Sequence, residues 1–194
     1  MKAAIVLLSS AAVQNYVRRI VFALNAQYKV GLFASLLPSH VSLKQPFTFE
    51  SMDVLETYFD NLAGRIAPFE IELNRFYSEE WAGYGILGLN VVETPILRGL
   101  HNRINAELSQ LFKDTRAPHD GSGYRFHLTI EAGKLESANP YQVYFDHLSD
   151  PQVKMAFQAQ ELGLFYYPDE TYGAGPFITY RVMPLRGQPA GGQV

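Results

Sequence analysis

Residues 40–62 read HVSLKQPFTFESMDVLETYFDNL, and residues 127–148 read HLTIEAGKLESANPYQVYFDHL. Both stretches begin with a His-x-Ser/Thr tripeptide, and both contain Tyr-Phe-Asp, 18 residues after the histidine in the first stretch and 17 in the second. In each stretch the tripeptide lies in a segment typical of a β-strand, and Tyr-Phe-Asp lies in a segment typical of a helix. The sequence therefore predicts a duplicated strand–helix–strand unit, with copies that start 87 residues apart, at positions 40 and 127.

The remaining segments also alternate between strand and helix patterns. Further strands are expected at residues 3–8, 69–76, 84–92, 155–167 and 177–185, and the two tripeptides lie in strands expected at 40–43 and 124–130. Helices are expected to begin at residues that cap a first turn or precede a proline, namely Ser10, Ser51, Thr94 and Asn139. Residues 1–185 are thus predicted to form one domain, followed by a flexible tail at 186–194.

Composition limits the function classes. The chain has 194 residues, no cysteine and a formal net charge of −3. The lack of cysteine excludes a disulfide scaffold, a cysteine zinc site, an iron–sulfur cluster and thiol catalysis. The acidic balance argues against a broad surface for long duplex nucleic acid. No stretch approaches the ~20 apolar residues of a membrane span, and the apolar run at 3–8 is shorter than the ~7–15 residues of a signal-peptide core, so a cytoplasmic location is expected.

The two tripeptides place polar side chains on one face of each strand. Residues two apart share a face of a strand, which predicts two polar sets: His40, Ser42 and Lys44 in the first copy, and Arg125, His127, Thr129 and Glu131 in the second. A strand histidine is most often satisfied by a backbone carbonyl, and Ser or Thr beside it is ordinary strand filler. Because both tripeptides occur in matched register, we favour a functional cleft that the two copies share across a pseudo-twofold axis.

Two imidazoles across a cleft suit acid–base chemistry. An unperturbed histidine titrates near ~6.5, so one ring can be neutral while the other is charged. In a displacement at phosphorus, the neutral ring takes the proton of the attacking oxygen and the charged ring protonates the leaving oxygen. The Ser and Thr hydroxyls can donate to the non-bridging oxygens, so this chemistry requires no metal or other cofactor.

These motifs and their order along the chain resemble the 2H phosphoesterase superfamily, in particular its 2'-5' RNA ligase-like and cyclic phosphodiesterase members. The resemblance implies an α+β fold that is bilobal, with two antiparallel sheets, outer helices and a metal-independent site in a central cleft. It implies that His40 and His127 are catalytic and that Ser42 and Thr129 contact phosphate. The implied substrates are 2',3'-cyclic phosphates or related phosphodiesters of nucleotides and RNA ends.

The chain departs from this family at Ala132, where the second motif often has a basic residue. We therefore expect Lys44 and Arg125 to supply the positive charge for phosphate, although both could equally be solvated charges at a strand edge. Tyr124 and Tyr172 could stack on a nucleobase, but packing in the core is the commoner role for such residues.

Several functions remain open from the sequence. The first is a metal-independent phosphodiesterase that opens a cyclic phosphate and acts as a monomer; a 2'-5' RNA ligase would run the reverse reaction. The second is a non-catalytic module that binds a nucleotide or an RNA end, which the alanine at position 132 favours. A metal site that uses both histidines is disfavoured, because Ser and Thr are poor ligands.

Overall fold

The computed structural model describes residues 1–29, 37–81, 84–134, 140–148, 152–167 and 178–188. Four helices and eight strands lie within these ranges, in the following order: β1 Lys2–Leu8, α1 Ala11–Tyr28, β2 His40–Thr48, α2 Met52–Arg65, β3 Phe69–Trp81, β4 Tyr84–Val91, α3 Pro95–Leu111, β5 His127–Lys134, α4 Pro140–His147, β6 Gln152–Ala159, β7 Glu161–Tyr167 and β8 Ile178–Pro184.

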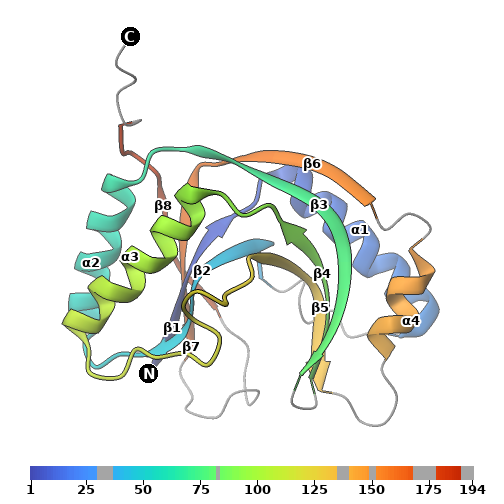
Figure 1. Ribbon diagram of the computed structural model, residues 1–194, viewed down its shortest axis with the longest axis horizontal. Helices are drawn as coiled ribbons and strands as arrows, with labels where there is room; N and C mark the ends of the chain where they lie inside the picture. The colour runs from blue at the N-terminus through green and yellow to red at the C-terminus, as the bar shows by residue number, and fades with distance from the viewer. Residues whose placement is uncertain (30–36, 82–83, 135–139, 149–151, 168–177, 189–194) are drawn as a thin grey trace.

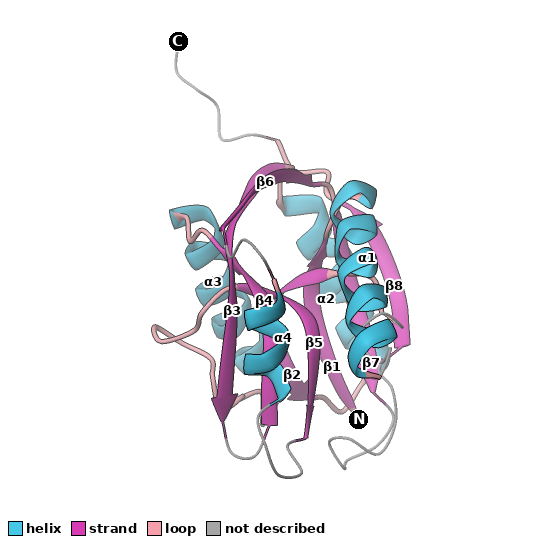
Figure 2. Ribbon diagram, turned by 90° about the vertical axis from the view of Figure 1, so that its right-hand side faces the viewer, coloured by secondary structure: helices cyan, strands magenta, loops and turns pink. Residues whose placement is uncertain are grey.

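The described strands form one antiparallel sheet in the order β6-β3-β4-β5-β2-β1-β7-β8. The expected α+β class is confirmed, whereas the expected pair of separate sheets is not. The sheet bends strongly, with α2 and α3 along one flank and α1 and α4 along the other (Figure 1). A quarter turn shows α1 and α4 side by side in front of the strands (Figure 2), and their Tyr28 and Tyr144 rings lie 5.2 Å apart.

The sheet has two halves of four strands that meet at the motif strands. Between β2 and β5 only Val41 and Leu128 are paired among the described residues, whereas the pairs within each half extend along most of the strand. Helix α1 packs against β5 and α3 packs against β2, so the helix that precedes each motif strand in the chain covers the motif strand of the other copy. The two copies are thus interleaved, and the motif strands lie at the centre of one sheet.

The main hydrophobic core lies between the sheet and the helices. On β1 the odd-numbered residues from Ala3 to Leu7 pack into this core, as does the apolar stripe of α1. The even-numbered residues of β1 face the other side of the sheet, in a small cluster that consists of Ala4, Val6, Leu8 and Phe165. A strand buried on both faces reads as a continuous apolar run, which explains the pattern at residues 3–8.

Three of the predicted helix starts are confirmed by their capping geometry. The side-chain oxygens of Ser10, Ser51 and Thr94 each accept a hydrogen bond from the backbone N–H three residues later, at 3.3–3.4 Å. A cap of this kind is worth about 1 kcal/mol. The fourth expected start, Asn139, lies outside the described residues, and α4 begins at Pro140.

Two predicted boundaries are wrong. The stretch 155–167 forms two strands, β6 and β7, with Gln160 between them. The predicted tail begins too early, because the backbone N–H of Arg186 donates to the Ala63 carbonyl at 3.0 Å and that of Gly187 donates to the Ile66 carbonyl at 2.9 Å. Residues 186 and 187 therefore belong to the folded domain, and residues 189–194 lie outside the described part of the chain.

Candidate active site

The two motif tripeptides place their polar side chains on the same face of the sheet. Val41 and Leu128, which pair across β2 and β5, are both fully buried in the main core. Side chains alternate along a strand, so the residues on either side of this pair point to the opposite face. That face therefore carries four motif side chains, all half-buried: His40, Ser42, His127 and Thr129. We refer to it below as the histidine face.

Both histidines make the same hydrogen bond. The Nδ1 atom of His40 lies 2.9 Å from the Pro38 carbonyl oxygen, and that of His127 lies 2.9 Å from the Arg125 carbonyl oxygen. A carbonyl oxygen only accepts, so in each ring Nδ1 carries the hydrogen and Nε2 carries the lone pair of the neutral imidazole. The two copies therefore hold their rings alike, and each presents Nε2 as the nitrogen that can take up a proton.

The pKa values of both histidines are lowered, and charge on His127 acts on His40. Burial lowers the pKa of His40 from 6.5 to about 4, the hydrogen bond to Pro38 opposes this shift, and charge on His127 adds to it. Burial also lowers the pKa of His127, whereas its bond to Arg125 and the charge of Glu79 raise it. Both rings are thus neutral at pH 7 in the free protein, and His127 has a carboxylate nearby that favours its charged form.

The surroundings of the two histidines differ. His40 lies opposite Leu8 of β1 and meets the Phe165 ring edge-on, with centroids 4.7 Å apart. His127 lies opposite Asn90 of β4 and meets the Tyr77 ring at 6.1 Å. The first histidine therefore has an apolar surrounding, whereas the second has a polar one.

The expectation that Lys44 shares a face with His40 and Ser42 is wrong. Ser42 pairs with Val6, but Lys44 pairs with Ile5, so Leu43 is inserted in β2 as a β-bulge. The bulge turns Lys44 to the face of Ile5, inside the main core, where it is fully buried and forms an ion pair with Asp120. Lys44 therefore does not contribute to the histidine face.

The same irregularity occurs in the second motif. Thr129 pairs with Gly88 and Glu131 pairs with Leu87, which leaves Ile130 as the inserted residue in β5. Glu131 is 4% exposed and lies on the core face, beneath α4, rather than beside His127 and Thr129 as expected. The repeat thus extends beyond the tripeptides, because each motif is followed by a bulge that turns a charged residue into the core.

Tyr124 has a structural role in place of the expected stacking role. It is 3% exposed, and its ring stacks on the imidazole of His101 at 4.6 Å with an interplanar angle of 5°. Its hydroxyl donates to the Ser42 carbonyl at 3.0 Å. A ring that is buried against His101 is not available to a nucleobase, so the predicted stacking by Tyr124 is wrong.

His101 joins the loop after α3 to the first motif strand. Its Nδ1 donates to the Leu43 carbonyl at 2.9 Å, and its Nε2 accepts from the backbone N–H of Gly121 at 3.0 Å. Burial lowers the pKa of this ring, which keeps it neutral. The sequence gives no signal for this role of His101, because a helix histidine on an apolar stripe cannot be distinguished from other core residues.

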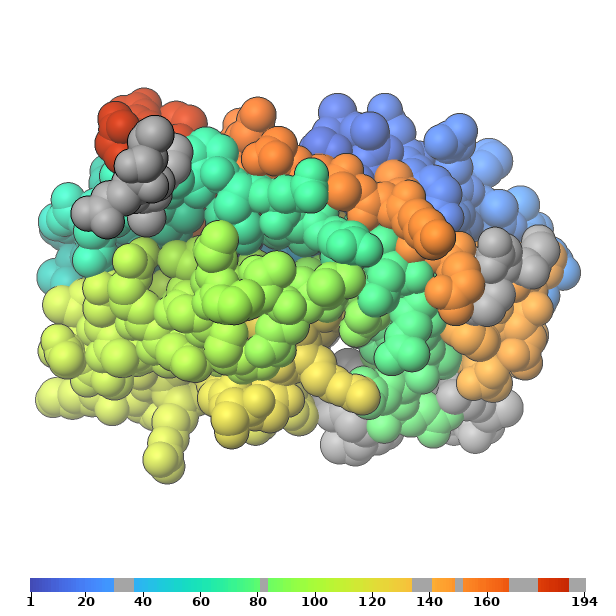
Figure 3. Space-filling model, turned by 45° about the horizontal axis from the view of Figure 1, so that its top comes forward, coloured from blue at the N-terminus to red at the C-terminus, as the bar shows by residue number. Residues whose placement is uncertain are grey.

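Arg125 lies beside the site, two residues before His127 in the chain. It is exposed, and its guanidinium forms an ion pair with Glu79 at 2.7 Å. Figure 3 shows a hollow in the surface between the loop that follows α3, in yellow, and β3, in green. The other residue expected to stack on a base, Tyr172, lies outside the described residues.

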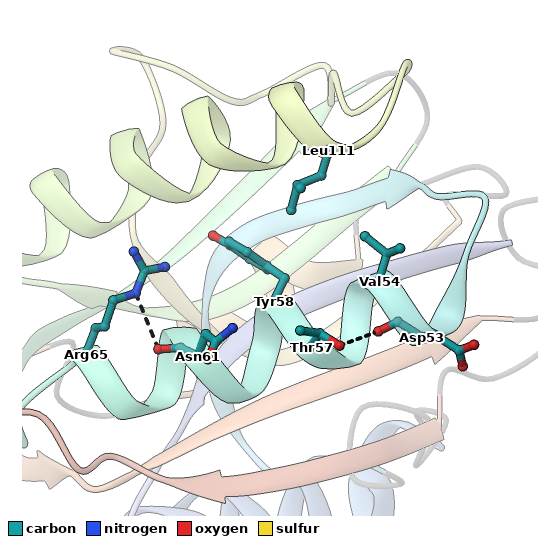
Figure 4. A pocket seen from close by; sticks show the side chains of 7 residues that line it. All are labelled: Asp53, Val54, Thr57, Tyr58, Asn61, Arg65 and Leu111. Carbon is teal, nitrogen blue, oxygen red and sulfur yellow. Dashed lines mark hydrogen bonds between the residues drawn. The ribbon is translucent and has the colours of Figure 1, made fainter.

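A groove outside the histidine face lies between two helices. It has a volume of about 660 Å³ and lies between α2 and α3, and its lining contains neither motif histidine (Figure 4). Beside it Glu107 accepts hydrogen bonds from Tyr58 at 2.9 Å and from both terminal nitrogens of Arg65, which ties the two helices together. Among the described residues no three His, Asp or Glu side chains form a set that could hold a metal ion, and no helix is long and apolar enough to span a bilayer.

Comparison with known proteins agrees with this architecture. The family model described as the 2'-5' RNA ligase superfamily matches residues 9–171. The chain belongs to this superfamily. It is a superfamily of 2H phosphoesterases, as the two His-x-Ser/Thr motifs suggest. No curated protein matches the chain.

Several solved structures share the fold of this chain at low sequence identity. TT0787 of Thermus thermophilus has a TM-score of 0.68 and 16% identity, and the alignment covers 97% of this chain and all of that one. Escherichia coli LigT in complex with 3'-AMP has a TM-score of 0.54 and 15% identity, with 95% and 97% covered. Kluyveromyces marxianus Usb1 has a TM-score of 0.56 and 12% identity, with the same coverage.

Proposed function

We propose that the protein is a metal-independent phosphodiesterase that opens a cyclic phosphate by acid–base catalysis with His40 and His127. One observation carries the proposal. The two imidazoles lie on one face of adjacent strands, each with Nδ1 bonded to a carbonyl, and the charge of one influences the other. Two groups that present Nε2 to the same region can take a proton from one oxygen of a phosphorus centre and give a proton to another.

The surroundings of the rings favour one assignment of roles. His40, whose pKa is about 4, is neutral at almost any working pH and acts as the base. His127, next to the carboxylate of Glu79, acts as the acid. The Nε2 atom of His40 takes a proton from water, the water oxygen bonds to phosphorus, and the bond from phosphorus to one ribose oxygen breaks. That oxygen takes the proton that Nε2 carries in the charged form of His127, which leaves a phosphomonoester.

Ser42 and Thr129 supply hydroxyl donors beside the histidines. Each lies two residues after its histidine on the histidine face, and hydroxyl groups there can bond the non-bridging oxygens, on which charge increases in the transition state. Arg125 supplies positive charge near the His127 side. A nucleotide or RNA-end substrate is supported by analogy, since LigT has been crystallised with 3'-AMP, ATP and phosphate.

The test is turnover of 2',3'-cyclic nucleotides in the presence of EDTA. We expect His40→Ala and His127→Ala each to lower kcat by ~10²-fold or more. The chain offers a matched control in His147, which also begins a His-x-Ser sequence but lies at the exposed end of α4. His147→Ala should keep wild-type activity. Wild-type rates in the two motif variants would contradict the mechanism, and loss of activity with EDTA would point to a metal.

One observation favours a second function, a nucleotide-binding module without turnover. Lys44, which was expected to supply charge to the site, is buried on the other face, and position 132 is alanine. A module of this kind would bind 3'-AMP in an equilibrium titration and would turn over none of the cyclic nucleotides, in either the wild type or the variants. The kinetic assay above therefore separates the two functions.

A further inference from the structure

Tyr77, Gly88 and Thr129 form a row across three strands on the histidine face. Tyr77 of β3 pairs with Gly88 of β4, and Gly88 pairs with Thr129 of β5. The neighbouring pair of Phe76 and Leu89 lies in the main core, so the row faces the other way, towards the site.

The tyrosine ring lies over the glycine. A Cβ atom at position 88 would lie 2.7 Å from Cε1 and 3.0 Å from Cζ of Tyr77, and 3.0 Å from the Leu128 carbonyl oxygen. The hydroxyl-bearing end of the ring thus occupies the space that any other residue at position 88 would fill. Adjacent strands are ~4.8 Å apart, so a phenol that extends across β4 brings its hydroxyl towards Thr129 of the next strand.

The ring is also next to the second histidine and its charged neighbours. Tyr77 meets His127 edge-on, with centroids 6.1 Å apart and an interplanar angle of 76°. Burial raises the pKa of the phenol, the charges of Glu79 and Tyr124 add to this, and Arg125 opposes it. The hydroxyl therefore keeps its hydrogen at neutral pH and can act as a donor.

The first half of the sheet has no equivalent of this hydroxyl. The strand order is symmetric about β2 and β5, so the matching row there consists of Gly163, Val6 and Ser42. In that row the side chain next to the motif strand is Val6, and the residue beyond it is glycine. The second half has the reverse arrangement, a glycine next to the motif strand and a tyrosine that leans over it.

We propose that Tyr77 is a substrate-contacting residue, whose hydroxyl donates a hydrogen bond to a non-bridging oxygen of the phosphate held between Thr129 and His127. The inference rests on the proposed function. It makes Tyr77 the third hydroxyl of the site and places two of the three on the side of the leaving group. Gly88 is required because only a residue without a side chain lets the phenol cross β4.

The test is Tyr77→Phe, which removes the hydroxyl and keeps the ring. A hydrogen bond to a charged group is worth ~1.5–3 kcal/mol, so we expect kcat/KM for a 2',3'-cyclic nucleotide to fall about 10- to 100-fold. The affinity for inorganic phosphate, measured by isothermal titration calorimetry, should weaken in the same variant. The pH limbs of kcat should stay in place, because both histidines keep their surroundings. Tyr180→Phe is the matched control, since that hydroxyl bonds Glu56 at the sheet edge.

The outcomes separate this inference from the proposed function. Wild-type kcat/KM and phosphate affinity in Tyr77→Phe, with activity lost in His127→Ala, would overturn the role of Tyr77 alone. Wild-type activity in His127→Ala would overturn the proposed function. A shift of the pH limbs without a change in phosphate affinity would show that Tyr77 acts on His127 and does not contact phosphate. Gly88→Ala, with its fold checked by circular dichroism, should reproduce the loss of phosphate affinity.

Discussion

Glu131 offers a direct test of how the bulge in β5 places its side chain. The carboxylate is 4% exposed, and its Oε2 atom has no hydrogen-bond partner among the described residues. Burial raises its pKa from 4.5 to about 7, and a hydrogen bond from the backbone N–H of Ala132 opposes part of the shift. Its charge also raises the pKa of Tyr141 and Tyr144, two residues of the helix α4 that packs over Glu131. Folding therefore favours the protonated acid.

The sign of the pH dependence follows from this shift. Because the folded protein binds this proton more tightly than the unfolded chain, its contribution to stability is fully present below pH 4.5 and is lost as the pH rises to about 7. A shift from 4.5 to about 7 corresponds to about 3 kcal/mol, at ~1.4 kcal/mol per unit. Glu131→Gln keeps the shape of the side chain and stays neutral, so the stability of this variant does not fall in this way as the pH rises.

The assay is urea unfolding of the wild type and Glu131→Gln from pH 4.5 to pH 8. The free energy of unfolding of the variant, relative to the wild type, should rise by about 3 kcal/mol across this range. Glu70→Gln, which removes a carboxylate from the exposed face of β3, is the control for a change in net charge. A relative stability of Glu131→Gln that stays constant with pH would refute the burial of this carboxylate in the core.

Three further predictions concern the rest of the molecule. Asp120→Asn leaves the Lys44 ammonium buried without its counter-charge and should lower the free energy of unfolding by about 3–5 kcal/mol in urea. Gly187→Ala should lower the melting temperature and cost about 1–3 kcal/mol, because its Cβ would lie 2.6 Å from the backbone of Ile66. The kcat/KM profile should be bell-shaped with its maximum below pH 6.5, since the pKa values of His40 and His127 are both lowered; a maximum above pH 7 would contradict the assigned roles.

Much of the fold follows from short-range patterns in the sequence. Capping residues and apolar stripes locate the helices, because both act within one or two turns. The strand expected at 69–76 also forms, and its residues alternate: Ile71 and Leu73 are fully buried, whereas Glu70 and Glu72 are exposed. Within each tripeptide the rule that alternate residues share a face holds, so His40 lies beside Ser42 and His127 beside Thr129. The pairing of Val41 with Leu128 then brings both histidines to one face of the sheet.

The same rule fails beyond the tripeptides. A bulge adds one residue to one strand of a pair. The inserted residues, Leu43 and Ile130, are ordinary strand residues, so the sequence does not predict either bulge. The bulge at Leu43 turns Lys44 to the other face, which removes it from the expected site. The position of Tyr77 in the site could not be predicted from the sequence for a different reason. Its place beside Thr129 depends on the register of three strands, two of which are distant from β5 in the sequence.

The proposed mechanism requires the two halves to differ. If the duplicated halves were identical, their histidines would have the same intrinsic pKa, and the surroundings would not favour either ring as the charged one. Here the histidines are the same, and the residues opposite them have diverged: Leu8 faces His40, whereas Asn90 faces His127. An apolar neighbour favours the neutral ring, and a carboxylate such as Glu79 favours the charged one. The division into base and acid therefore resides in the strands beside the motifs, and an exchange of roles would require changes in β1 and β3 rather than in the motifs themselves.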